Sequence, residues 1–185
     1  MATPTTLPAA FTAGQVLTAA QQNALRGAFR VLQVVSTAKT NTFTTTSTTF
    51  TDITGLSATI TPSSTSSKIL IFAMVNISAS VASGDAVSVR LSGGNATTFV
   101  GDASSSQVRA AMFSNNRTDW GVTHSVLPGN IMYLDSPATT SATTYVVQGR
   151  ANTQGTFVLN YAGNTNSSAT FSVVPSSITV MEISA

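Results

Sequence analysis

From about residue 31 onward, hydrophobic and polar residues alternate along the chain with a period of two. The alternation is clearest over 56–61, 87–92 and 157–161. Each of these segments predicts a β-strand with one buried face and one face toward solvent. The pattern therefore predicts an all-β domain over residues 36–185.

Two segments, 69–75 and 178–183, are apolar on both faces. This is typical of a strand that has one face in the core and the other against a neighbour. Turn residues separate the strands, and Leu127–Pro128–Gly129–Asn130 fits a type II turn, with glycine where φ must be positive. Roughly eight to ten strands at this spacing, with no helical segment between them, predict an antiparallel β-sandwich or jelly roll.

Residues 1–35 follow a different pattern and predict an anchoring arm with one short helix. Prolines near the start favour an extended chain. Thr18 and Gln21 fit a capping box, and the apolar positions that follow have helical spacing, so a helix is predicted over about 18–30. A helix this short is marginal alone and has to dock, either on its own domain or on another chain.

The composition suits strands and leaves little charge. About 30% of residues are Ser or Thr, 8% are charged, and the formal net charge is +2; this usage disfavours helices. The basic residues are dispersed, whereas a nucleic-acid interface normally has a clustered basic face. The longest apolar run, 69–75, is far shorter than the ~20 residues of a membrane-spanning helix, and no secretory signal is recognisable at the start. We therefore expect a soluble protein with no nucleic-acid partner and no membrane partner.

Few residues could support catalysis or hold a metal. The acids are well separated, there is no cysteine, and no calcium-loop, zinc or phosphate-binding motif is present. His124 is the single histidine, and no G-x-S-x-G motif accompanies it. We therefore expect a protein that is not an enzyme, with no catalytic residue, metal or cofactor. Strands could still bring Asp102, Asp119 and Asp135 together, as a polysaccharide depolymerase would require.

The loop over 114–120 combines the single tryptophan with amide and charged side chains. This composition is common where a protein binds a sugar or another protein, because it offers apolar area together with polar groups. The candidate receptor-contact residues are Asn115, Asn116, Arg117 and Trp120. Alternatively, the tryptophan folds back and covers the end of the sandwich.

Several stretches resemble proteins of tailed bacteriophages. Residues 11–23, FTAGQVLTAAQQN, resemble the opening of phage structural proteins of the minor tail or tail-fibre type. Residues 50–71 resemble the start of a jelly-roll domain that recurs in phage virion proteins, and 141–148 and 178–183 resemble its later strands. Such domains are similar to tumour-necrosis-factor-like jelly rolls and usually form trimers. Residues 80–140 fall outside the likeness.

The resemblance implies a non-enzymatic structural protein of the virion, a trimeric tail-fibre or minor tail subunit that contacts the host surface. Its arm would anchor it to other virion proteins through Phe11, Val16, Leu17, Leu25 and Phe29. Its final strand would form the trimer interface through Ile178, Val180, Met181 and Ile183. Two alternatives stay open. One is a capsid decoration or head-fibre protein bound to the shell, and the other is a carbohydrate-binding receptor module for a host surface glycan.

Overall fold

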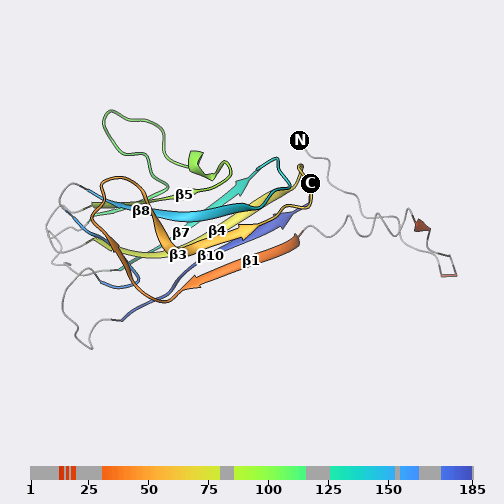
Figure 1. The fold of residues 1–185 in the computed structure, drawn as a ribbon, viewed down its shortest axis with the longest axis horizontal. Coiled ribbons are helices and arrows are strands. Elements are labelled where there is room, and N and C mark those ends of the chain that lie inside the picture. Colours follow the sequence, from red (N-terminus) through yellow and green to blue (C-terminus); the bar gives the residue numbers. More distant parts are fainter. Residues whose placement is uncertain are drawn as a thin grey trace.

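The chain forms an antiparallel β-sandwich in a computed structural model (Figure 1), which describes residues 13–14, 16, 18–19, 31–79, 86–115, 126–152, 155–162 and 172–184. The described residues form ten strands and one short 3-10 helix, η1 (Ala96–Thr98). The strands are β1 (Val31–Lys39), β2 (Phe43–Thr45), β3 (Thr51–Ile60), β4 (Lys68–Ala79), β5 (Ala86–Ser92), β6 (Met112–Asn115), β7 (Leu127–Asp135), β8 (Thr143–Ala151), β9 (Phe157–Leu159) and β10 (Ser176–Ile183). The predicted all-β sandwich or jelly roll is confirmed.

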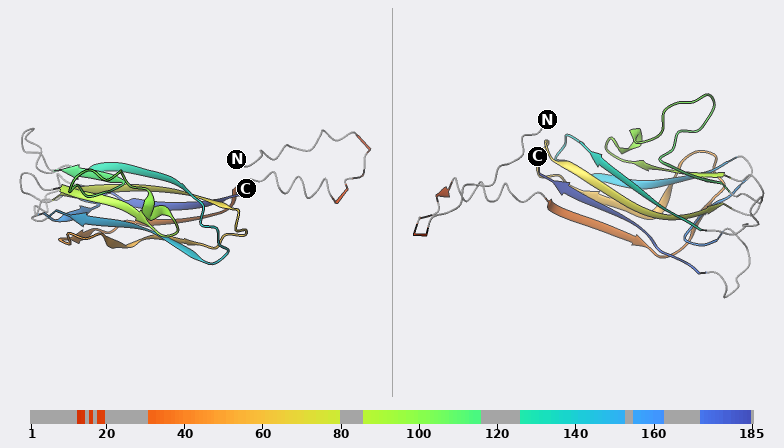
Figure 2. Two further views of the ribbon diagram at one scale, coloured as in Figure 1. Left: turned by 90° about the horizontal axis from the view of Figure 1, so that it is seen from above. Right: turned by 180° about the vertical axis from the view of Figure 1, so that it is seen from behind.

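Two antiparallel sheets face each other (Figure 2). The first sheet has the order β1-β10-β4-β9-β2, with β7 also paired to β4, and the second has the order β3-β8-β5-β6. Strand β4 pairs with β7 over Ile69–Ile77 along one edge, and with β10 and then β9 along the other edge. The long strands of the first sheet therefore lie in the order β1-β10-β4-β7. These four long strands form one layer, and the four strands of the second sheet form the other. Two four-strand layers with the chain crossing between them are the arrangement of a jelly roll.

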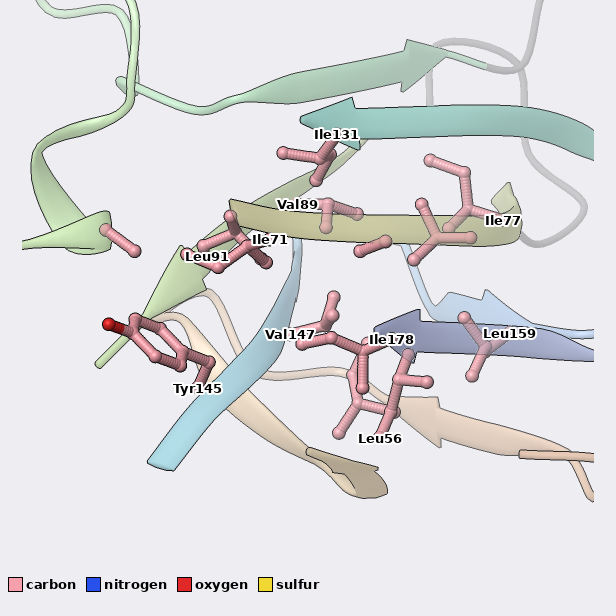
Figure 3. Packing of buried hydrophobic residues seen from close by; sticks show 14 of the residues in the cluster. Leu56, Ile71, Ile77, Val89, Leu91, Ile131, Tyr145, Val147, Leu159 and Ile178 are labelled. Atoms are coloured by element: carbon pink, nitrogen blue, oxygen red, sulfur yellow. The ribbon is translucent and has the colours of Figure 1, made fainter. Parts of the chain in front are cut away.

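The core fills the space between the two sheets (Figure 3). It is formed by the inward-facing members of the alternating patterns. In β3, Leu56, Ala58 and Ile60 are buried, whereas Ser57 and Thr59 lie on the opposite face. In β5, Val87, Val89 and Leu91 are buried at the same alternating spacing. The alternation predicted from the sequence is confirmed in these strands, because each strand has one side in the core.

Residues 127–130, which the sequence predicts to be a type II turn, instead form the first part of β7. Pro128 is tolerated there because, among the described strands, β7 pairs with β4 alone and is therefore an edge strand. The N–H that proline lacks is not needed for a hydrogen bond to a second neighbouring strand. Gly129 does not have a positive φ. Its lack of a side chain provides space instead, since a Cβ at this position would collide with Sδ of Met112 on β6.

The first strand begins beside the end of the last one. Val31 of β1 pairs with Ile183 of β10, so the N-terminal segment joins the sandwich at the end where β10 stops. The last five residues of the segment 1–35 belong to β1. Apart from Thr18 and Ala19, the predicted helix lies outside the described residues, and so does most of the predicted arm.

Candidate functional site: an apolar sheet face

The outer face of the first sheet has hydrophobic side chains where a solvent-facing sheet would normally have polar ones. One row crosses all four long strands at directly paired positions. Its members, in strand order, are Val34, Met181, Leu70 and Leu134. The two outer members are each 54% exposed and the two central ones are half-buried. A row of four apolar side chains on an exposed sheet face is unusual for a surface that meets only water.

A second row lies two residues further along each strand. It consists of Ser36, Thr179, Phe72 and Met132. Its hydrophobic members lie on β4 and β7, where Phe72 is 42% and Met132 is 62% exposed. Directly opposed side chains on one sheet face are close enough to contact one another. The two rows therefore form one continuous patch, which we call the apolar face.

Polar residues limit the apolar face along the strands. Toward the start of β1, the next row contains Val31 and Ile183 but ends at Lys68, whose Nζ donates a 2.8 Å hydrogen bond to Oγ of Ser136. In the other direction the next row ends at the exposed Asn130 of β7. The apolar face itself contains no charged side chain. Apolar surface with a polar rim is the composition of an interaction surface.

The four residues predicted as the trimer interface are divided between the two faces of β10. Ile178 and Val180 are fully buried and point into the core, so they are not available to a partner. Met181 and Ile183 are half-buried on the outer face. The reason is that successive side chains of a β-strand point to opposite faces of the sheet.

The other hydrophobic members of the apolar face were not predicted from the sequence as interface residues. Leu70 and Phe72 are the second face of a segment that the pattern already marked as apolar on both sides. Met132 and Leu134 point outward from β7. In the sequence, they could have been recognised from the apolar run that directly follows the wrongly predicted turn. Val34 lies in β1, within the segment 1–35.

The carboxylate of Glu182 fixes the end of β10 to the segment that follows β3. Glu182 is fully buried. It accepts hydrogen bonds from Nε2 of Gln33 at 2.6 Å, from the Ser63 backbone N–H at 2.7 Å and from Oγ of Ser63 at 2.6 Å. Burial by itself raises the pKa of this carboxyl, but the hydrogen bonds from Ser63, Gln33 and Ser67 outweigh burial and lower the pKa to about 2. The buried carboxylate of Glu182 thus fixes the position of β10, the strand on which the outward-facing residues Met181 and Ile183 lie.

This arrangement predicts an acid-sensitive contribution to stability. The pKa of Glu182 in the folded chain, about 2, lies below its ordinary value of 4.5, so the carboxylate stabilises the fold above pH 4.5 and loses its contribution as the pH falls toward 2. We expect the contribution to be roughly 3 kcal/mol at neutral pH. Chemical denaturation of the wild type and of Glu182→Gln at pH 7 and pH 2.5 measures it, and the two proteins should differ less at the lower pH.

Asp52→Asn is the matched control for Glu182→Gln. Asp52 is exposed and accepts one hydrogen bond, from Nε2 of Gln148 at 2.7 Å. We expect this control to lower the free energy of unfolding by less than about 1 kcal/mol. An equal loss in Asp52→Asn and Glu182→Gln would show that the buried hydrogen bonds of Glu182 have no special weight.

Asp135 also has a structural position. It is fully buried, and its Oδ2 accepts hydrogen bonds from the Tyr145 hydroxyl at 2.6 Å and from the Asn95 backbone N–H at 3.1 Å. Its Oδ1 accepts one from the Ser136 backbone N–H at 2.7 Å. Burial, and next the hydrogen bond to Asp135, raise the pKa of Tyr145 well above its usual value, so the phenol stays protonated. Asp135 is therefore occupied within the fold and is not placed to act on a polysaccharide.

The other predicted site residues are described only in part. Asn115 is the last residue of β6 and pairs with Ala86 of β5, while Asn116, Arg117 and Trp120 lie outside the described residues. Of the predicted anchoring residues, Phe11, Leu17, Leu25 and Phe29 also lie outside them. Val16 is described and is 89% exposed.

The fold and the apolar face define the chain as a jelly-roll protein whose first sheet has exposed hydrophobic side chains on its outer face, among the residues that the structure describes. No known protein family matches the sequence, and no curated protein matches it. Within the described part of the chain, no helix is long and apolar enough to cross a membrane. The same residues contain no group of three or more His, Cys, Asp or Glu side chains that could hold a metal ion.

Proposed function

We propose that the chain is a non-enzymatic structural subunit of a phage virion, of the tail-fibre or minor tail type. It assembles as a homotrimer through the apolar face, and its N-terminal arm attaches it to other virion proteins. The observation that supports this proposal most directly is the pair of cross-strand rows on the first sheet. The resemblance of residues 11–23 and 50–71 to phage virion proteins supports the location.

The apolar face fits self-association because of its extent and position. Strands lie about 4.8 Å apart, so a row across four strands extends about 15 Å. Burying an exposed Met, Leu or Phe side chain contributes about 1.5–3 kcal/mol when burial is complete, and each subunit offers several. Because every copy has the same sheet, copies arranged around a rotation axis bury these faces together and leave none exposed.

The positions of the acids are consistent with a structural role. Glu182 and Asp135 are both fully buried, and each accepts several hydrogen bonds, including bonds from other segments of the sandwich. A depolymerase would need a pair of carboxyl groups that face the substrate. Asp135 cannot supply one of them without opening the core. A stable, polar Ser- and Thr-rich surface suits a particle protein instead.

The arm is attached at one end of the sandwich, which leaves the other end free. The N-terminal segment enters at Val31, beside Ile183. The opposite end contains the start of β5 and the end of β8, where the backbone N–H of Asn152 donates to the carbonyl of Ala86. Figure 1 shows β1 beginning at the end of the sandwich where β10 stops. A subunit anchored by its arm would therefore present the opposite end outward.

Deleting residues 1–30 tests the role of the arm. Because β1 begins at Val31, the deletion leaves every described strand intact, and we expect a folded trimer that no longer incorporates into particles. Circular dichroism, light scattering and the protein content of purified particles measure the three properties. The double substitution Leu25→Asp and Phe29→Asp should have the same effect, whereas Gln22→Ala should incorporate normally. Unfolding of the deleted protein would assign the arm to the core of the domain instead.

The place of the subunit on the particle separates tail from capsid. Antibody or gold labelling of the intact protein in phage particles should mark the tail or its baseplate. Density for the domain at the threefold positions of the head would identify a capsid decoration or head-fibre protein and would reject the tail location.

A further inference from the structure

A pocket lies at the end of the sandwich opposite the arm. It has a volume of about 580 Å³ and is formed between the outer face of the second sheet and the segment 101–111, which leads from η1 to β6. This segment arches away from β5 in Figure 1. The volume lies within the range of about 300–1,000 Å³ that is usual for small-molecule sites. The pocket belongs to neither the apolar face nor the core.

The floor of the pocket is one cross-strand row of the second sheet. Phe113 of β6 is paired with Ser88 of β5, and Ser88 is paired with Arg150 of β8. All three line the pocket. Phe113 is 58% exposed, so its ring offers an apolar surface to a ligand. Exposed aromatic rings next to polar groups are typical of sites that bind molecules with one apolar and one polar side.

Two arginines border the pocket, and each is held by a backbone carbonyl. Nε of Arg109 donates to the carbonyl of Gly101 at 2.7 Å, and Nε of Arg150 donates to the carbonyl of Ala151 at 3.2 Å. These bonds orient the guanidinium groups and leave their terminal nitrogens out of the contact. Among the residues that the structure describes, neither arginine forms a salt bridge. A guanidinium in this state is suited to pair with a carboxylate through two parallel hydrogen bonds.

The charge of the pocket favours an anion. Its lining contains Arg109 and Arg150 but a single acid, Asp102. Two of the eight basic residues of a chain that is only 8% charged therefore line the same pocket. The amide of Gln107 and the hydroxyl of Ser88 lie in the same lining and supply neutral hydrogen-bonding groups. Neutral polar groups, an aromatic surface and a cationic pair together match a sugar ring that has a carboxylate.

We propose that this pocket binds an acidic saccharide, that is, a sugar unit with a carboxylate group. The carboxylate pairs with Arg109 and Arg150, and the apolar face of the ring lies against Phe113. The segment that the sequence marked as a receptor loop, 114–120, begins with the last two residues of β6, so it is adjacent in the chain to Phe113 of the pocket. Use of the pocket in host attachment rests on the proposed virion function, but the binding itself does not.

Titration calorimetry on the purified full-length chain tests the binding. The acidic probes are 3′-sialyllactose and cellobiouronic acid, and the neutral controls of similar size are lactose and cellobiose. We expect at least one acidic probe to bind at least about tenfold more tightly than the neutral control of similar size. The reason is that losing a bidentate hydrogen-bonded contact to a charged group weakens binding by about that factor. Added salt should weaken the binding.

Substitution of the arginines locates the site. Arg109→Gln and Arg150→Gln should each weaken binding of the acidic probe about tenfold without changing the melting temperature. Arg90→Gln is the matched control, because Arg90 lies on the same sheet but outside the pocket, with its guanidinium 4.3 Å from the Phe50 ring centroid and its Nε bonded to Gln148. This control should bind as the wild type does.

Three results would overturn the proposal. The first is no binding of either acidic probe at millimolar concentration, and the second is equal binding of acidic and neutral probes. The third is tighter binding of a tetraglutamate peptide than of both saccharides, which would indicate a protein ligand. A negative result would leave the trimer and its anchoring untouched, because those are measured by light scattering and particle incorporation.

Discussion

Leu134→Glu is expected to convert the protein from a trimer into a monomer. Leu134 lies at the β7 end of the first row of the apolar face and is 54% exposed, so a glutamate is accommodated in the isolated subunit without disturbing the core. In the assembly, the same substitution would place a carboxylate from every copy in an apolar interface. Removing a charge from water without a partner costs several kcal/mol per group. No basic side chain lies in either row of the face to offset this cost.

Light scattering coupled to size exclusion measures the result. The wild type should have a mass of three times 19.0 kDa, and Leu134→Glu should have a mass of one subunit. Met132→Glu should behave in the same way, since Met132 is 62% exposed in the second row. Val173→Glu is the matched control, because Val173 is 60% exposed and lies outside the apolar face. Its mass should equal that of the wild type.

Two outcomes would contradict the assignment of the interface. If Leu134→Glu and Met132→Glu remain trimeric, the subunits associate through another surface. If the wild type is itself a monomer at micromolar concentration, the apolar face does not mediate self-association. Circular dichroism should show the same strand content in all variants, so that loss of assembly is not confused with unfolding.

Asn160→Ala is expected to cause the largest loss of stability of any single polar substitution considered. Asn160 follows β9 and is fully buried. Its Nδ2 donates to the carbonyls of Lys39 and Asn41 at 2.8 and 2.9 Å, and its Oδ1 accepts from Oγ of Ser176 at 2.6 Å. Oγ of Ser176 in turn accepts from the Asn76 backbone N–H at 3.0 Å. One side chain therefore joins the end of β1, the start of β10 and β4.

Alanine at position 160 would leave three hydrogen-bonding groups without this partner: the buried Oγ of Ser176, the buried carbonyl of Lys39 and the partly buried carbonyl of Asn41. Each buried group that is left unsatisfied costs about 1–3 kcal/mol. The backbone adds to the loss, because Asn160 has a φ of 72°, which asparagine and glycine adopt more readily than alanine. We expect the free energy of unfolding to fall by about 4 kcal/mol or more. Chemical denaturation followed by tryptophan fluorescence or circular dichroism measures the loss.

Two further variants separate the causes. Asn160→Gly removes the hydrogen bonds but keeps a favourable φ, so it should lose slightly less stability than Asn160→Ala. Asn130→Ala is the matched control, since Asn130 is exposed on β7, and it should change stability by less than about 0.5 kcal/mol. If Asn160→Ala and Asn130→Ala lose the same stability, the buried network around Asn160 does not hold the strands together.

The local pattern was sufficient to predict the fold because strand alternation acts within a few residues. Leu56, Ala58 and Ile60 were predicted to share a buried face and do so. The segment 69–75, which is apolar on both faces, was predicted to have one face in the core and the other against a neighbour. Its inward-facing residues do lie in the core. The glycine at 129 misled the prediction, because proline followed by glycine is typical of a turn, whereas here the glycine makes room for Met112.

The sequence alone determined that this chain is an all-β sandwich with apolar residues in excess of what one core requires. It could not determine which outward residues lie together, because Val34, Leu70, Leu134 and Met181 are separated by many residues and meet only through the pairing of four strands. The same holds for the pocket, where Ser88, Phe113 and Arg150 come from three strands. Sequence patterns report the side of a strand on which a residue lies, whereas strand order and register decide its neighbours. The tertiary structure therefore decided both surfaces.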